Sequence, residues 1–182
     1  MSTPPTKEQL QRMVPVVCKL VGQIPCFHVF EEYVAQRFGK GEAEVSLQAY
    51  MHNAALDSAL LSLRCFNEFF KPGGREDDVR AHHFPVPALS PFLPPDEERA
   101  IHKHLAHLTL TRMNLAETPW YVDQMVLRGL EHGIRFLSPV ESGFPLGSES
   151  AAHELRGVRE GCGLFINKIT NRHRPQDSTT PH

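Results

Sequence analysis

Apolar residues recur at helical spacing over most of the chain, and prolines mark where that spacing is interrupted. A proline inside a helix removes a backbone hydrogen bond and clashes with the preceding turn. The long proline-free intervals are therefore the candidate helices, and they cover residues 26–71, 96–118, 120–138 and 146–174. Alternating apolar and polar runs, which indicate half-buried strands, are not evident in the sequence. The pattern predicts an all-α protein.

The clearest predicted helix covers residues 44–70. Its apolar residues form one broad stripe that includes Leu56, Leu60 and Leu63, and alanines and phenylalanines widen this stripe on both sides. A helix that is apolar over most of its circumference packs against several neighbours. We therefore expect it to be the central helix, ended by the Pro-Gly-Gly sequence at 72–74.

Four further segments show apolar residues at helical spacing, at 6–21, 26–38, 96–113 and 119–138. Pro15 predicts a break or kink in the first of them. Asp96 is a capping residue at the start of the third. Thr118 caps the fourth and Pro119 takes its first position, and this helix is expected to end before Pro139.

Residues 72–95 contain six of the 15 prolines and form a long loop between helices. A loop of this length caps the bundle, lines a site or is an adaptable insertion. After residue 140 the apolar pattern weakens, with room for one short helix at 149–160. We expect an up-and-down bundle of four to five helices over residues 1–140, followed by a loosely structured C-terminal segment at 141–182.

Composition narrows the class of protein. The 182 residues carry a formal net charge of -2 and 22% charged side chains, which is typical of one globular domain. This near-neutral charge argues against a polybasic nucleic-acid binder, although it does not exclude a local basic patch. No run approaches 18 apolar residues, and the start shows no secretory signal pattern. The four scattered cysteines read as reduced thiols. We expect a cytoplasmic protein with no membrane partner.

The most distinctive stretch is 98–109, where three histidines lie within six residues. Because each helical residue advances by about 100°, Arg99, Lys103 and His107 lie along one line. His102 and His104 point to the two flanks of an apolar stripe. A site shared by all five side chains therefore requires a neighbouring helix or a second subunit.

Several short motifs resemble the HEPN superfamily (higher eukaryotes and prokaryotes nucleotide-binding). These are Arg99 and His104 with four residues between them, together with the segments 56–70, 77–79 and 104–109. The resemblance covers residues 44–137. Members are compact helical domains that often act as metal-independent endoribonucleases, with an active site formed where two subunits meet.

The resemblance implies a homodimer that binds RNA or cleaves it without a metal or other cofactor, in bacterial defence or in a toxin–antitoxin system with a cognate antitoxin-type protein. Histidine exchanges protons near neutral pH, and arginine stabilises phosphate charge. On this hypothesis Arg99, His104 and His107 are catalytic. Lys103 and His102 bind phosphate.

The motif departs from the pattern Arg-Asn-x-x-x-His of active members. In the register that ends at His104, Ala100 stands at the asparagine position. In the register that ends at His107, His102 stands at the arginine position and Lys103 at the asparagine position. A non-enzymatic dimeric interaction bundle with a degenerate motif is therefore the alternative.

A histidine-liganded metal protein is the third hypothesis. His104 and His107 have neighbouring spacing on a helix, and His52 or the histidines at 82–83 are candidates for a further ligand. No paired Glu-x-x-His motif occurs, and the adjacent arginine and lysine repel a cation. No metal ligands are therefore assigned.

Polar residues also interrupt the apolar stripe of the 44–70 segment. They are His52, Asn53 and Asn67, and Asp57 and Arg64 lie on the flank of the stripe. Because buried polar groups require partners, we expect a structural network across helices. Candidate partners of Arg64 are Asp57 of a neighbouring copy and the acidic residues at 77–78 and 97–98.

Overall fold

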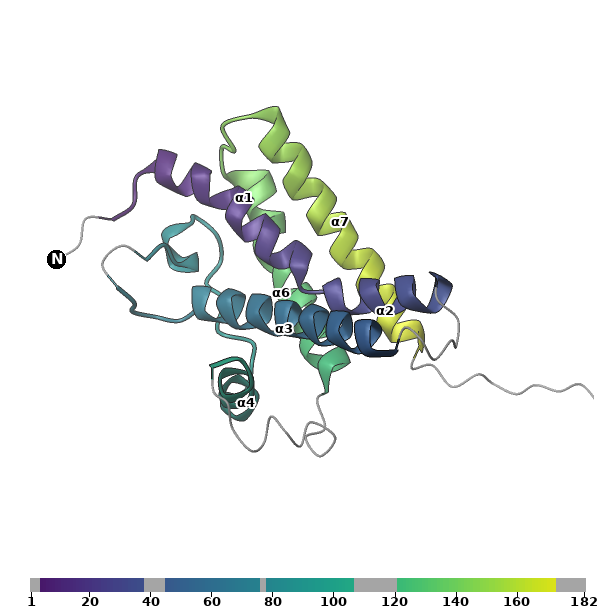
Figure 1. Ribbon diagram of the computed structural model, residues 1–182. Helices are drawn as coiled ribbons and strands as arrows, with labels where there is room; N and C mark the ends of the chain where they lie inside the picture. The colour runs from purple at the N-terminus through teal and green to yellow at the C-terminus, as the bar shows by residue number, and fades with distance from the viewer. Residues whose placement is uncertain (1–3, 38–44, 76–77, 107–120, 173–182) are drawn as a thin grey trace, which may run out of the picture.

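The computed structural model describes residues 4–37, 45–75, 78–106 and 121–172 (Figure 1). In these ranges the chain forms six α-helices and one short 3-10 helix, with no strand. The prediction of an all-α protein is confirmed, with more helices than the four to five expected.

The α-helices are α1 (Lys7–Gln23), α2 (Cys26–Arg37), α3 (Val45–Phe69), α4 (Pro95–Ala106), α6 (Val122–Gly143) and α7 (Glu149–Arg172), and the 3-10 helix η2 is Ala81–His83. α6 and α7 form an antiparallel pair, and α1 packs against α7 and α3 (Figure 1). α2 packs along α3, and α4 packs on another side of α3. The expected bounds of α2 and α3 agree with the structure to within one residue.

A cluster of phenylalanine rings forms one end of the core. Its members are Phe66, Phe69, Phe70, Phe84, Phe92 and Phe136, many of them in edge-to-face contact. Phe84 and Phe92 come from the proline-rich loop (residues 70–94), whereas Phe136 comes from α6. Aromatic pairs of this geometry stabilise a core beyond their buried area. The loop is therefore packed onto the bundle at two points.

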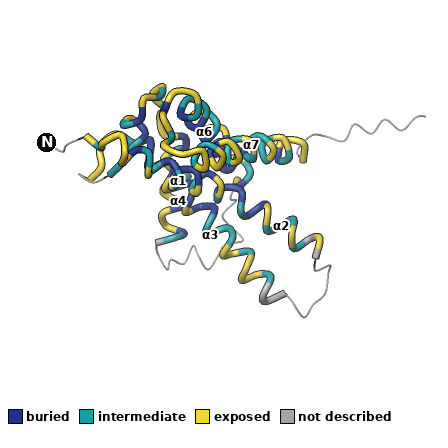
Figure 2. Tube along the Cα trace, turned by 90° about the horizontal axis from the view of Figure 1, so that it is seen from above, coloured by how far each residue is buried: buried dark blue, intermediate teal, exposed yellow. Residues whose placement is uncertain are grey.

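The central helix α3 is buried on several sides only in its C-terminal half, where Leu60, Leu63 and Phe66 are fully buried. Its N-terminal half extends with α2 away from the rest of the molecule (Figure 2). Tyr50, on that half, is 74% exposed. The expectation of a helix packed against several neighbours therefore holds for the C-terminal half, whereas α2 covers only one side of the N-terminal half.

Two prolines lie inside helices, although a break or kink was expected at Pro15 and a helix end before Pro139. α1 continues across Pro15 and α6 continues across Pro139. Val14 and Val17 are buried on either side of Pro15, and Val140 and Phe144 are buried beyond Pro139. Apolar packing on both sides of each proline offsets the lost hydrogen bond.

The C-terminal segment is not loosely structured over its described part. α7 is 24 residues long, with Leu155, Cys162 and Ile169 buried at intervals of seven residues. Gly133 of α6 permits close approach, because a Cβ there would lie 2.8 Å from Val21 Cγ1 and 3.7 Å from the sulfur of Cys162. Packing of α7 on α6 and α1 therefore extends the expected short helix, and residues 173–182 lie outside the described ranges.

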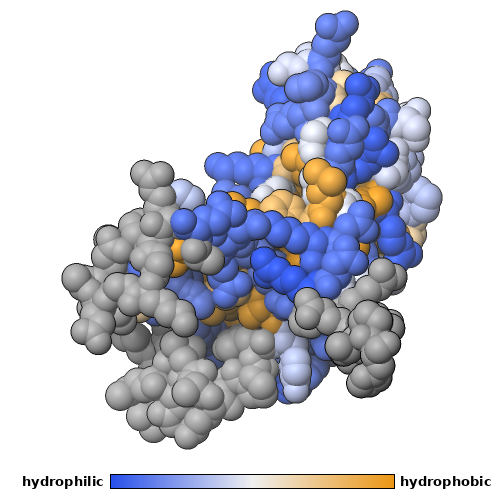
Figure 3. Space-filling view, turned by 90° about the vertical axis from the view of Figure 1, so that its right-hand side faces the viewer, coloured by the Kyte–Doolittle hydropathy of each residue, from blue (hydrophilic) through white to orange (hydrophobic). Residues whose placement is uncertain are grey.

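The surface carries both hydrophilic and apolar side chains. The face at the right of Figure 1 is largely hydrophilic, with apolar side chains gathered near its middle (Figure 3). No single helix in the described ranges is long and apolar enough to cross a membrane, whereas α1 and the start of α2 reach that length together with a bend of 43° between them.

The expected cap at Thr118 and Pro119 lies outside the described residues, and α6 begins at Val122.

Candidate functional site

The residues predicted on α4 are divided between two sides of the helix. Arg99 is exposed, and its Nε donates to the carbonyl oxygen of Pro95 at 3.2 Å. His102 and Lys103 are also exposed. His104 faces the protein interior and is only 7% exposed. His107 lies outside the described residues.

His104 contacts the central helix. Its Nε2 lies 2.8 Å from Oδ1 of Asp57, so this polar pair joins α4 to α3. A buried imidazole bonded to a carboxylate stabilises the packing of two helices. The described residues of one chain therefore do not bring Arg99 and His104 into one open site.

Asn67 is a buried polar residue with a clear structural role. Its Oδ1 accepts hydrogen bonds from the backbone N–H groups of Phe92 at 2.8 Å and Leu93 at 2.9 Å. Asn67 is fully buried, so these bonds are shielded from water. They attach the end of the proline-rich loop to α3.

The remaining polar residues of α3 do not join Asn67 in one network. The ring of His52 stacks on Phe27 at 4.7 Å, with Nε2 3.9 Å from Oε1 of Glu31. Asn53 is exposed to solvent. The polar residues of α3 therefore make separate contacts with different neighbours: His52 with α2, Asp57 with α4 and Asn67 with the loop.

The acidic residues considered as partners of Arg64 are bound to other groups. Asp57 contacts His104, and the described acidic residues in the two other candidate segments each contact a different cation. These ion pairs are Asp78 with Arg80, Glu97 with Arg128, and Glu98 with Lys71. Asp77 lies outside the described residues.

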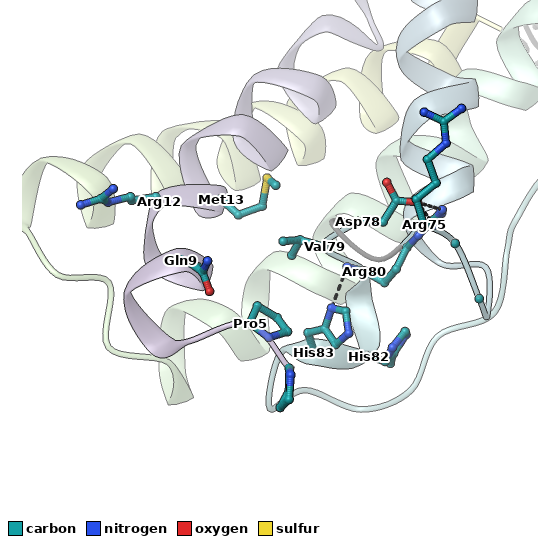
Figure 4. A pocket seen from close by; sticks show the side chains of 13 residues that line it. Pro5, Gln9, Arg12, Met13, Arg75, Asp78, Val79, Arg80, His82 and His83 are labelled. Atoms are coloured by element: carbon teal, nitrogen blue, oxygen red, sulfur yellow. Dashed lines mark hydrogen bonds and ion pairs between the residues drawn. The ribbon is translucent and has the colours of Figure 1, made fainter. Parts of the chain in front are cut away.

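An open cavity of about 540 Å³ lies between the start of α1 and the proline-rich loop (Figure 4). Its charged or titratable lining residues are Arg12, Arg75, Asp78, Arg80, His82 and His83. We call this cavity the loop pocket. Its volume is in the usual range of ligand sites, ~300–1,000 Å³.

Asp78 and Arg80 hold the loop in shape. Oδ2 of Asp78 accepts from the backbone N–H of Arg75 at 2.8 Å and from Nη2 of Arg80 at 2.6 Å. These contacts, the backbone bond foremost, lower the pKa of the Asp78 carboxyl. Arg80 also donates to the backbone carbonyl of Glu68. Among the described residues no ion pair engages the side chains of Arg12 or Arg75.

Gly74 makes the Asp78–Arg80 pair possible. Its φ is 127°, a backbone conformation that other residues rarely adopt. A Cβ at this position would lie 2.6 Å from both Arg80 Nη2 and Asp78 Oδ2. Any other residue here would displace the ion pair.

His83 presents a hydrogen-bond donor. Its Nδ1 accepts from the backbone N–H of Arg80 at 3.0 Å, so Nε2 carries the proton of the neutral ring. Burial lowers the pKa of His83, and the nearby His82 and Arg80 lower it further. The centroids of the His82 and His83 rings are 4.2 Å apart. At neutral pH, His83 is therefore a neutral N–H donor.

Guanidinium groups together with N–H donors are the usual protein ligands of phosphate. The loop pocket can therefore bind a phosphate-bearing anion. Sequence reasoning had recognised that the long loop is able to line a site and had noted its adjacent histidines. It missed Arg12, because only the fold brings the first helix beside the loop.

A second open cavity, of about 560 Å³, lies between α2, α6 and the end of α7. Beside it His28 is 2% exposed, with Nε2 3.3 Å from Oδ1 of Asp123, which lines the cavity. Burial is the largest effect on the pKa of His28, and it lowers that pKa. In the described ranges no group of three His, Cys, Asp or Glu side chains is placed to hold a metal ion.

The chain matches no known protein family, and no match is found among curated proteins or solved structures. The geometry of the loop pocket is therefore the basis for a functional proposal.

Proposed function

We propose that the protein binds RNA through the loop pocket, without a metal ion or other cofactor. The observation that carries this proposal is the presence of Arg12 and Arg75 at one open cavity, with no ion-pair partner among the described residues. Arg80 is paired with Asp78, whereas the guanidinium groups of Arg12 and Arg75 form no ion pair within the described residues, although the charge of Arg75 also acts on Asp78.

The placement of the two cations favours a polyanion. Arg12 on α1 and Arg75 on the loop lie at opposite sides of the pocket, and in Figure 4 both side chains extend outward, away from His83. A nucleic-acid strand carries one charge at each phosphate, so guanidinium groups that lie apart can contact different phosphates of one strand. His83 adds an N–H donor between Pro5 and His82 (Figure 4).

RNA is proposed as the nucleic acid because of the resemblance of residues 44–137 to HEPN-like domains. Membership of that superfamily, a homodimer and an antitoxin-type partner stay predictions.

The geometry supports binding more than cleavage. His104 is buried against Asp57, away from Arg99, so this pair is not arranged around one phosphate. His83 offers a protonated Nε2, which is a donor to phosphate and not a base for the 2′-hydroxyl. The non-enzymatic interaction bundle remains the rival reading.

Fluorescence anisotropy with labelled single-stranded RNA in excess chelator tests the proposal. The double variant Arg12→Ala, Arg75→Ala should bind at least about tenfold more weakly, because two phosphate contacts are lost. Lys19→Ala, which removes an exposed cation further along α1, is the matched control and should bind normally. Equal affinity of the wild type and the double variant would contradict the proposal.

The same samples run on a denaturing gel separate binding from cleavage. We expect the RNA to remain uncleaved in the presence of excess chelator. Cleavage that disappears in Arg99→Ala or His104→Ala would instead support the enzymatic hypothesis and would overturn the preference for binding.

A further inference from the structure

A third cavity, with a lining that is equally polar and apolar, adjoins the loop pocket. It is open, has a volume of about 430 Å³, and is lined by Phe70, Pro72, Leu89 and Pro91 among others. Gly73 and His82 line both cavities. The loop pocket and this cavity are therefore adjacent parts of one surface of the proline-rich loop.

We propose that this adjoining cavity, which offers both apolar and polar side chains, receives one unpaired base of the bound RNA, so that the protein selects single-stranded RNA over duplex RNA. This inference rests on the proposed function of the loop pocket. Because Gly73 and His82 line both cavities, the base site lies directly beside the phosphate site, as the base and the phosphate do in one nucleotide. Arg75 and His82 line the same pocket, so one RNA strand can contact both.

The lining suits the flat face of a nucleobase. Leucine and proline side chains offer apolar surfaces, and the ring of His82 at the shared edge offers a partner for stacking. Contacts of this kind stabilise binding to single strands and tolerate any base, because every base has a π-face. A paired base in a duplex is stacked and cannot enter the cavity.

The cavity is held in place by the bundle. Phe70, which lines it, is buried in the phenylalanine cluster. The backbone carbonyl of Ser90 lies 3.0 Å from Nε2 of His132 on α6. Asn67 fixes the following residues of the loop. A preformed cavity needs little ordering when RNA binds, which favours affinity.

The test compares three ligands of equal length with the full-length protein: a single-stranded RNA, its duplex, and a ribose-phosphate strand without bases. The wild type should bind the single strand about tenfold more tightly than either of the others, since one stacked base contributes on this scale. This comparison needs no variant, so it does not depend on the folding of any mutant.

Two variants locate the base site. Leu89→Asp should weaken binding of the single strand. It should leave binding of the baseless strand nearly unchanged once the effect of the added negative charge on RNA affinity has been subtracted. Ala88→Asp adds the same charge at the neighbouring exposed residue, which is not among the lining residues of either cavity, and measures that effect. Circular dichroism checks that both variants are folded.

The outcomes separate this inference from the proposal on which it rests. Equal binding of all three ligands, with weaker binding of all three by Arg75→Ala, would overturn the base site and leave RNA binding intact. Equal binding that Arg75→Ala does not affect would overturn both. Selective loss of single-strand binding in Leu89→Asp supports both.

Discussion

α4 and the proline-rich loop both carry arginines and histidines close together in sequence, but the structure treats the two groups differently. On α4 the helical turn separates them, so Arg99 lies in solvent while His104 is buried against α3. In the loop the chain folds back, and Arg75 and His83 line one cavity. Proximity along the chain therefore indicates a shared site only when the backbone between the residues turns them toward each other.

The loop can bring Arg75 and His83 to one cavity only if its far end is held on α3, and Asn67 makes that attachment. Asn67→Ala leaves the backbone N–H groups of Phe92 and Leu93 without their buried acceptor. We expect a loss of about 3 kcal/mol in the free energy of unfolding, measured by urea denaturation. Asn53→Ala, at an exposed position of the same helix, should change it by less than about 0.5 kcal/mol. Equal losses in the two variants would show that the loop is not held by Asn67.

The second prediction concerns the structural role of His104. Because His104→Ala removes a buried contact with Asp57, it should lower the free energy of unfolding by about 2 kcal/mol. Its RNA affinity, measured below the unfolding transition, should stay within about twofold of the wild type. Arg99→Ala should alter neither quantity. A large loss of RNA affinity in a stably folded His104→Ala protein would show that RNA binds at α4 and not at the loop pocket.

The third prediction uses the two adjacent glycines of the loop. Gly73 and Gly74 both have positive φ, so alanine at either position should cost about 1 kcal/mol in backbone strain. Only a Cβ at Gly74 meets the Asp78–Arg80 pair, whereas no atom lies within 4 Å of a Cβ at Gly73. Gly74→Ala should therefore weaken RNA binding several-fold more than Gly73→Ala does. Equal RNA affinities would show that the ion pair does not shape the pocket.

The smallest expected effect is on pH dependence. The pKa of His83 is below its usual value in the free protein, and bound phosphate favours the protonated ring and raises that pKa. RNA binding should therefore tighten as the pH falls from 8 to 6, with His83 contributing about threefold. Affinity titrations of His83→Gln should show a correspondingly flatter profile. An unchanged profile would place His83 away from the phosphates.

Much of the fold followed from the sequence. The α2 and α3 bounds and the proline-rich loop were predicted from apolar spacing and helix-ending residues. The continuation across Pro15 and Pro139 was not, because packing on both sides of a proline is invisible to local rules. The length of α7 was missed for a similar reason: Leu155, Cys162 and Ile169 are sparse in a polar segment, and only α6 and α1 explain their burial.

The candidate site was less accessible to sequence reasoning. Burial of His104 depends on Asp57, which is 47 residues away. The loop pocket depends on Arg12, a residue of the first helix, and on the hydrogen bonds of Asn67 to the far end of the loop. Long-range contacts of this kind leave no periodic signal.

The most direct measurement is the salt dependence of RNA affinity for the wild type, Arg75→Ala and Arg99→Ala. Each phosphate contact with a single strand contributes about 0.7 to the slope of log K against log salt concentration. The account predicts that Arg75→Ala lowers this slope by about that amount and that Arg99→Ala leaves it unchanged. A slope lowered by Arg99→Ala and unaffected by Arg75→Ala would contradict it and place the RNA on α4.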